Sequence, residues 1–154
     1  MMTKRIMNDY KEIEKEIIKN SIFPIIKIIY DKSNSLTCKI ILRGPSETPY
    51  ENGLFVLDVK FSSEYPFTSP SIYFGTPILH PNVANNGRIC IDILQNKWSS
   101  AFSLLSVILS ISSLLGDPNT KEPLNIEIND LYLKDLSAFN VTVREHVSKN
   151  TYKL

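Results

Sequence analysis

Two segments decide the fold class: residues 36–43, LTCKIILR, and residues 54–61, LFVLDVKF. Both place an apolar residue at every second position, with charged residues at some of the positions in between. A period of two is typical of strands that bury one face and expose the other. Residues 26–30 repeat this period, and residues 71–74 form a short fourth segment. We therefore predict four antiparallel strands, connected as a meander, between residues 24 and 74.

Helices are predicted before and after these strands. Residues 3–19 place isoleucine and tyrosine at helical spacing between charged residues. From residue 99 onward, leucine and isoleucine fill most positions beside a narrow stripe of serines, which predicts a buried central helix that ends at Gly116. Pro123 begins a last helical region, with a break near Lys134. The predicted class is α+β: an N-terminal helix, a four-stranded antiparallel meander, then a central helix and C-terminal helices.

Length and composition limit the class of protein. With 154 residues, 43% of them apolar, the chain has the size of one domain, residues 1–154, and can bury a core without disulfides. A net charge of +1 gives no reason to expect a nucleic acid or an anionic membrane as partner. The longest apolar run, residues 101–115, contains five serines and is shorter than the roughly 18 residues of a membrane-spanning helix. The N-terminus also lacks the apolar stretch of a signal peptide, so we expect a cytoplasmic or nuclear protein.

The two cysteines, Cys38 and Cys90, are interpreted differently. They lack the paired spacing of a zinc site, and we expect neither a metal nor a cofactor. Cys38 is on the apolar phase of its strand, where a cysteine acts as a small hydrophobic residue. Cys90 follows a segment rich in asparagine with no regular period, and a loop gives a nucleophile access to solvent. The pattern leaves two readings open: a catalytic thiol, or a residue of a short buried strand between Ile89 and Ile91.

Several motifs around Cys90 resemble the catalytic core of the ubiquitin-conjugating enzymes. They are His80-Pro81-Asn82, the segment Gly87-Arg88-Ile89-Cys90-Ile91-Asp92-Ile93-Leu94, Trp98, Asp117-Pro118-Asn119, and Tyr65-Pro66-Phe67 with Pro70. The similarity extends from Lys4 to about Lys149. The family has the same order of helix, meander and helices that the periodicity predicts.

The resemblance implies an activity. Cys90 would accept the C-terminal carboxyl of ubiquitin as a thioester from an activating enzyme, in an ATP-dependent pathway. It would then pass ubiquitin to a substrate lysine, with a ligase of the RING or HECT type. Exchange between thiols needs only a modest thiolate fraction, which a free thiol pKa of about 8.5 supplies.

Asn82 has two readings in this scheme. Its side-chain amide could donate to the oxyanion that forms when a lysine attacks the thioester. It could instead brace the loop of residues 80–90 through bonds to the backbone. The resemblance implies that His80 and Pro81 are structural members of this loop.

Two acidic residues are further candidates for the catalytic site. Glu122 stands where many members of the family have an aspartate that is thought to orient or desolvate the incoming lysine, and the extra methylene puts this role in doubt. The resemblance places Asp92, two residues after Cys90, near the site as well, although a solvated surface position is the alternative.

A binding surface for ligases and the activating enzyme follows from the same resemblance. It comprises Lys4, Arg5, Phe67 and Ser99-Ser100-Ala101, with Ser100 in place of a common proline. Phe67 lies beside two prolines and is interpreted as an interface anchor, with core packing as the alternative.

Three other functions compete with this assignment. A cysteine hydrolase would need a histidine base, and the chain has only His80 and His146. A non-catalytic module of the same fold normally lacks the cysteine. A modifier of the Rub type competes with ubiquitin. The chain begins two residues before Thr3, without the N-terminal extension of Rub-type enzymes, which favours ubiquitin. Residues 31–35 and 122–125, in contrast, are somewhat like the Rub-type branch. We expect ubiquitin.

Overall fold

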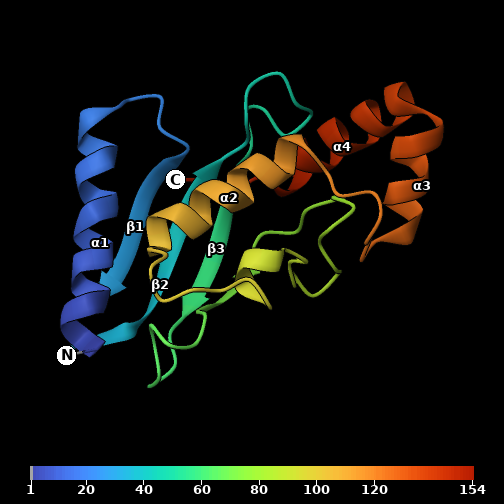
Figure 1. The fold of residues 1–154 in the computed structure, drawn as a ribbon. Coiled ribbons are helices and arrows are strands. Elements are labelled where there is room, and N and C mark those ends of the chain that lie inside the picture. The colour runs from blue at the N-terminus through green and yellow to red at the C-terminus, as the bar shows by residue number, and fades with distance from the viewer. Residues whose placement is uncertain (1) are drawn as a thin grey trace.

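The computed structural model describes the backbone of residues 2–154 and the side chains of residues 4–154 (Figure 1). Its elements are α1 (Met2–Lys19), β1 (Ile25–Asp31), β2 (Asn34–Arg43), β3 (Leu54–Lys60), β4 (Ser71–Phe74), the short 3-10 helix η1 (Asp92–Leu94), α2 (Leu104–Gly116), α3 (Ile126–Lys134) and α4 (Leu136–Asn150). The strands pair antiparallel in the order β1-β2-β3-β4. The predicted α+β class and the meander are confirmed.

The core lies between one face of the sheet and the helices. Ile40 of β2 pairs with Leu57 of β3, and both side chains are fully buried. Figure 1 shows α2 lying across the sheet and α1 lying alongside β1. Val107 and Ile111 of α2 belong to the same buried cluster as the strand residues. The period of two in the strands and the continuous apolar run of α2 therefore have one cause, which is burial in a shared core.

The last helical region begins later than predicted. The structure starts α3 at Ile126, with Asn125 as its N-cap accepting a hydrogen bond from the Ile128 N–H at 3.1 Å. The N–H groups of Leu124 and Asn125 donate to the carbonyl of Pro81, at 2.8 and 3.0 Å. The backbone of the two residues after Pro123 is thus bound to the loop around residue 81, and α3 begins only after them. The predicted break is confirmed, because Asp135 lies between α3 and α4.

None of the helices within residues 2–154 combines the length and the apolar character needed to cross a membrane.

Candidate active site

The segment from Asn82 to Cys90 folds back on itself as a narrow loop. The Cys90 N–H donates to the Asn82 carbonyl at 2.9 Å, and Val83 pairs with Ile89 in an isolated β-bridge. A turn closes the far end, where the Gly87 N–H donates to the Ala84 carbonyl at 2.9 Å. Cys90 therefore lies beside Asn82 at the open end of the loop. No strand is assigned at residues 89–91, so the alternative of a buried strand is wrong.

Gly87 attaches this loop to the edge of the sheet. Its φ angle is +89°, a left-handed conformation that favours glycine. Its carbonyl accepts a hydrogen bond from the Phe74 N–H of β4 at 2.9 Å. A Cβ atom at this position would lie 2.2 Å from the Phe74 carbonyl oxygen. Only glycine allows the loop to approach β4 this closely.

His80 is a fully buried residue at the base of the loop. Its Nδ1 accepts a hydrogen bond from the Asn82 N–H at 3.0 Å, so Nε2 carries the proton and donates to the Leu114 carbonyl at 2.8 Å. Burial lowers the pKa of His80 to about 4. The ring is neutral at physiological pH, and both of its nitrogens are engaged. It connects the loop to the C-terminal end of α2.

This buried histidine predicts a specific dependence of stability on pH. The folded state keeps His80 neutral down to about pH 4, whereas the unfolded chain binds a proton below about pH 6.5. The free energy of unfolding should therefore fall by about 3 kcal/mol between pH 6.5 and pH 4 through this residue. Denaturant unfolding of the wild type and of His80→Gln across this range measures the effect. Equal losses of stability in both proteins would assign the pH dependence to other groups.

Asn82 is also fully buried, and its side-chain amide binds a second loop. Its Nδ2 donates to the carbonyls of Asn119 and Glu122, at 2.8 and 3.3 Å. Its Oδ1 accepts from the Asn119 N–H at 2.8 Å. Both N–H bonds of the amide are thus directed at backbone oxygens of residues 119–122. The amide thus has a structural role, but it binds residues 119 and 122 rather than the backbone of residues 80–90 as the bracing hypothesis expected. In this arrangement it has no N–H left for an oxyanion.

Three of the four predicted catalytic residues line a common hollow. Cys90, Asp92 and Glu122 border a volume of about 490 Å³, together with Lys97 and Asn119 among others. Asp92 pairs with Lys97 at 3.4 Å, and both side chains are largely exposed. Asn82 does not line this hollow but holds the backbone of two residues that do. The structure thus brings together residues that are 32 positions apart in sequence.

Sequence reasoning did not single out Lys97 or Asn119 as members of this site. Asn119 was visible only as the last residue of the motif Asp117-Pro118-Asn119. Lys97 follows η1 in a segment without any regular pattern, and no local signal marks it. Among residues 4–154, no group of three or more His, Cys, Asp or Glu side chains is placed to hold a metal ion.

The two cysteines differ in their surroundings. Cys38 is only 5% exposed, and burial raises its pKa to about 12. The interpretation of Cys38 as a buried hydrophobic residue is confirmed. Cys90 is partly exposed and opens onto the hollow. Since the thiolate is the nucleophile, Cys90 is the cysteine that can react.

The loop thus places a partly exposed cysteine beside a buried His-Pro-Asn segment. The family model of the ubiquitin-conjugating enzymes matches residues 5–147. The chain belongs to the ubiquitin-conjugating enzyme family. It is accordingly a transferase of this family, as the sequence motifs predicted.

Curated relatives and solved structures agree with this assignment. This ubiquitin-conjugating enzyme is 37% identical to the ubiquitin-conjugating enzyme E2 2 of Neurospora crassa over 148 residues, which cover 96% of this chain and 94% of the relative. A solved structure from Plasmodium yoelii matches with a TM-score of 0.89 and 31% identity, covering 99% of this chain and 97% of the other. The E2 domain of a Toxoplasma gondii ubiquitin conjugating enzyme matches with a TM-score of 0.86 and 27% identity, covering 97% and 99%.

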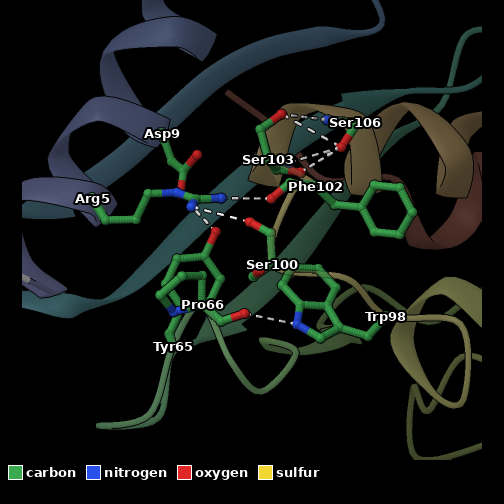
Figure 2. Close-up of polar contacts among 9 residues, drawn as sticks. All are labelled: Arg5, Asp9, Tyr65, Pro66, Trp98, Ser100, Phe102, Ser103 and Ser106. Carbon is green, nitrogen blue, oxygen red and sulfur yellow. Dashed lines mark hydrogen bonds and ion pairs between the residues drawn. The ribbon is translucent and has the colours of Figure 1, made fainter.

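The predicted partner surface of the enzyme is largely exposed. Phe67 is 82% exposed, so the alternative that it packs in the core is wrong. Lys4 and the segment Ser99-Ser100-Ala101 are also exposed. The indole N–H of Trp98 donates to the Pro66 carbonyl at 2.9 Å, which joins the loop that carries Phe67 to the segment that follows Trp98 (Figure 2).

Arg5, the remaining member of this surface, makes contacts within the enzyme. Its guanidinium donates to the Ser100 carbonyl at 3.2 Å and to the Phe102 carbonyl at 2.7 Å. It also pairs with the buried Asp9 at 3.4 Å (Figure 2). Arg5 therefore fastens α1 to the segment before α2, and it shapes the predicted surface by holding Ser100 in place.

Proposed function

We propose that this enzyme carries ubiquitin as a thioester on Cys90 and transfers it to the amine of a substrate lysine. One observation carries the proposal: of the two cysteines, Cys38 is buried and Cys90 borders a hollow that it shares with two acidic residues. A reactive free thiol also requires a reducing compartment, which supports the cytoplasm or the nucleus as its location.

The first step of the proposed reaction exchanges one thioester for another. The Cys90 thiolate attacks the carbonyl carbon of the ubiquitin thioester on the activating enzyme. A new C–S bond forms, and the thiolate of the activating enzyme leaves. Because the bond formed and the bond broken are alike, the step needs no dedicated base. This is compatible with His80, whose nitrogens are both engaged in hydrogen bonds.

The second step is attack by a neutral lysine amine on the Cys90 thioester. Negative charge develops on the carbonyl oxygen, the Cys90 thiolate leaves, and the amine loses a proton. Glu122 and Asp92 border the hollow through which the amine must approach. We assign them the orientation of the incoming amine and the acceptance of the proton that it loses when the C–N bond forms. Transfer to the thiol of a HECT-type ligase would repeat the exchange of the first step.

A cysteine hydrolase is a poorer account of the same residues. Such an enzyme needs a histidine base in contact with its thiol. His80 is buried with both ring nitrogens engaged. His146 lies on α4 and lines a different hollow from Cys90. Neither histidine is placed to activate Cys90.

The choice of ubiquitin over a Rub-type modifier is supported by the curated relatives, which are described as ubiquitin-conjugating enzymes. Parallel charging assays test it, with the ubiquitin and the Rub activating systems each supplied with ATP and their own modifier. We expect a reducible adduct with ubiquitin within minutes and little adduct with the Rub-type modifier. Efficient charging by the Rub system alone would reverse the assignment.

We further propose that Phe67 anchors RING-type ligases, because an aromatic side chain that is 82% exposed has little packing role. Phe67→Ala should form the thioester at the wild-type rate and weaken ligase binding by about 2 kcal/mol, or roughly 30-fold. Discharge of the thioester with and without a RING-type ligase measures this loss.

The matched control is Ile18→Ala, an 86% exposed apolar residue at the C-terminal end of α1, far along that helix from Arg5. It should keep full ligase stimulation. If Phe67→Ala responds to the ligase as the wild type does, Phe67 is not the anchor.

A further inference from the structure

Asn129 of α3 is an unusual residue for its position. It is only 5% exposed, on a helix whose neighbouring Ile128 belongs to the core. Among the side chains of residues 4–154, its Oδ1 is the one buried polar atom without a hydrogen-bond partner. Burying an unpaired carbonyl oxygen is unfavourable, and alanine or leucine would suit a buried helical position better. Packing therefore does not account for an asparagine here.

The other half of the same amide makes a single long-range contact. The Asn129 Nδ2 donates to the Thr120 carbonyl at 3.3 Å. Thr120 lies directly after Asn119, which both donates to and accepts from the Asn82 amide. Two buried asparagines, one from the His-Pro-Asn loop and one from α3, thus hold successive carbonyls of the segment 119–122.

Few other hydrogen bonds stabilise the conformation of the segment 119–122. It lies outside the helices, and the Lys121 N–H donates to the Asn119 side chain at 3.1 Å rather than to a backbone carbonyl. Asn119 and Glu122 at its two ends border the hollow of Cys90. Thr120 lies between these two residues, two positions before Glu122.

We propose that Asn129 is a positioning residue for the acceptor side of the active site, where it fixes residues 119–122 so that Glu122 meets the incoming lysine. The inference rests on the proposed thioester chemistry of Cys90. Asn129 touches none of the reacting atoms and acts through Glu122. It should matter when an amine attacks the thioester and not when Cys90 accepts ubiquitin from the activating enzyme.

The experiment compares Asn129→Ala, Asn129→Leu and the neighbouring exposed control Asp130→Ala with the wild type. Charging with ubiquitin should stay within twofold of the wild type in all of them. Single-turnover discharge to free lysine should be at least fivefold slower in both Asn129 variants and unchanged in the control. The melting temperature of Asn129→Ala should stay close to that of the wild type, because loss of the bond to the Thr120 carbonyl is offset by removal of the unpaired oxygen and by the helix propensity of alanine.

The same substitution in a protein that already carries Glu122→Ala distinguishes a positioning role of Asn129 from a general structural role. In Glu122→Ala, adding Asn129→Ala should cause no further slowing, because the group through which Asn129 acts is already absent. A full additional fivefold loss would overturn the proposal, as would wild-type discharge in the single variants or failure of both variants to fold. Failure of the wild type to charge with ubiquitin would instead refute the proposed function itself.

Discussion

A Cys90→Ser variant incubated with activating enzyme, ATP and ubiquitin is expected to form an adduct that survives thiol reductants. The serine hydroxyl accepts the acyl group as an oxyester, whereas the wild-type adduct is a thioester that a reductant cleaves. Transfer to lysine from the variant should become undetectable, because an alkoxide is a far poorer leaving group than a thiolate. Electrophoresis of the reaction with and without reductant measures both results.

Cys38→Ser provides the matched control for this experiment. Cys38 is 5% exposed and its pKa is raised to about 12 by burial, so very little thiolate exists there at neutral pH. This variant should form a normal reducible adduct. If a reducible adduct persisted in Cys90→Ser, the thioester would have to be carried by another group, and the assignment of Cys90 would be wrong.

The fold was predictable from the sequence where burial leaves a periodic pattern. The alternation in β2 and β3 follows from one buried face and a second face that is exposed only in part, since Ile41 and Val56 on it are buried as well. The apolar run of α2 follows from its place across that sheet. The start of α3 was not predictable in this way. Its delay to Ile126 depends on bonds from Leu124 and Asn125 to the carbonyl of Pro81, which is more than 40 residues away in sequence.

The site was predictable only in part, and for the same reason. The resemblance to a family led to Cys90, Asp92 and Glu122, but nothing in the local sequence indicates that residue 122 reaches the hollow of residue 90. That proximity depends on the buried amide of Asn82, which joins the two loops. Arg5 likewise donates to the carbonyls of Ser100 and Phe102, which lie about 95 residues away in sequence. No local sequence pattern indicates these contacts.

Asn82 carries the second large expected effect. Asn82→Ala removes three hydrogen bonds to residues 119 and 122 and leaves their backbone groups unpaired. We expect the free energy of unfolding to fall by about 2 kcal/mol. We also expect discharge of the Cys90 thioester to free lysine to slow by about 10²-fold, because the freed loop no longer holds Glu122 in place, with charging affected far less. Denaturant unfolding and single-turnover kinetics measure the two changes.

Measuring the effect of Asn82→Ala in a protein that already carries Glu122→Ala distinguishes the two possible roles of Asn82. If the amide only braces residues 119–122, its loss should add little once Glu122 is absent, as for Asn129. If the amide instead turns toward the oxyanion during the reaction, the 10²-fold loss should persist in that background, because donation to the oxyanion does not pass through Glu122. The structure commits both N–H bonds of the amide to backbone carbonyls, so we expect the first result. Near-wild-type discharge from folded Asn82→Ala would contradict both roles.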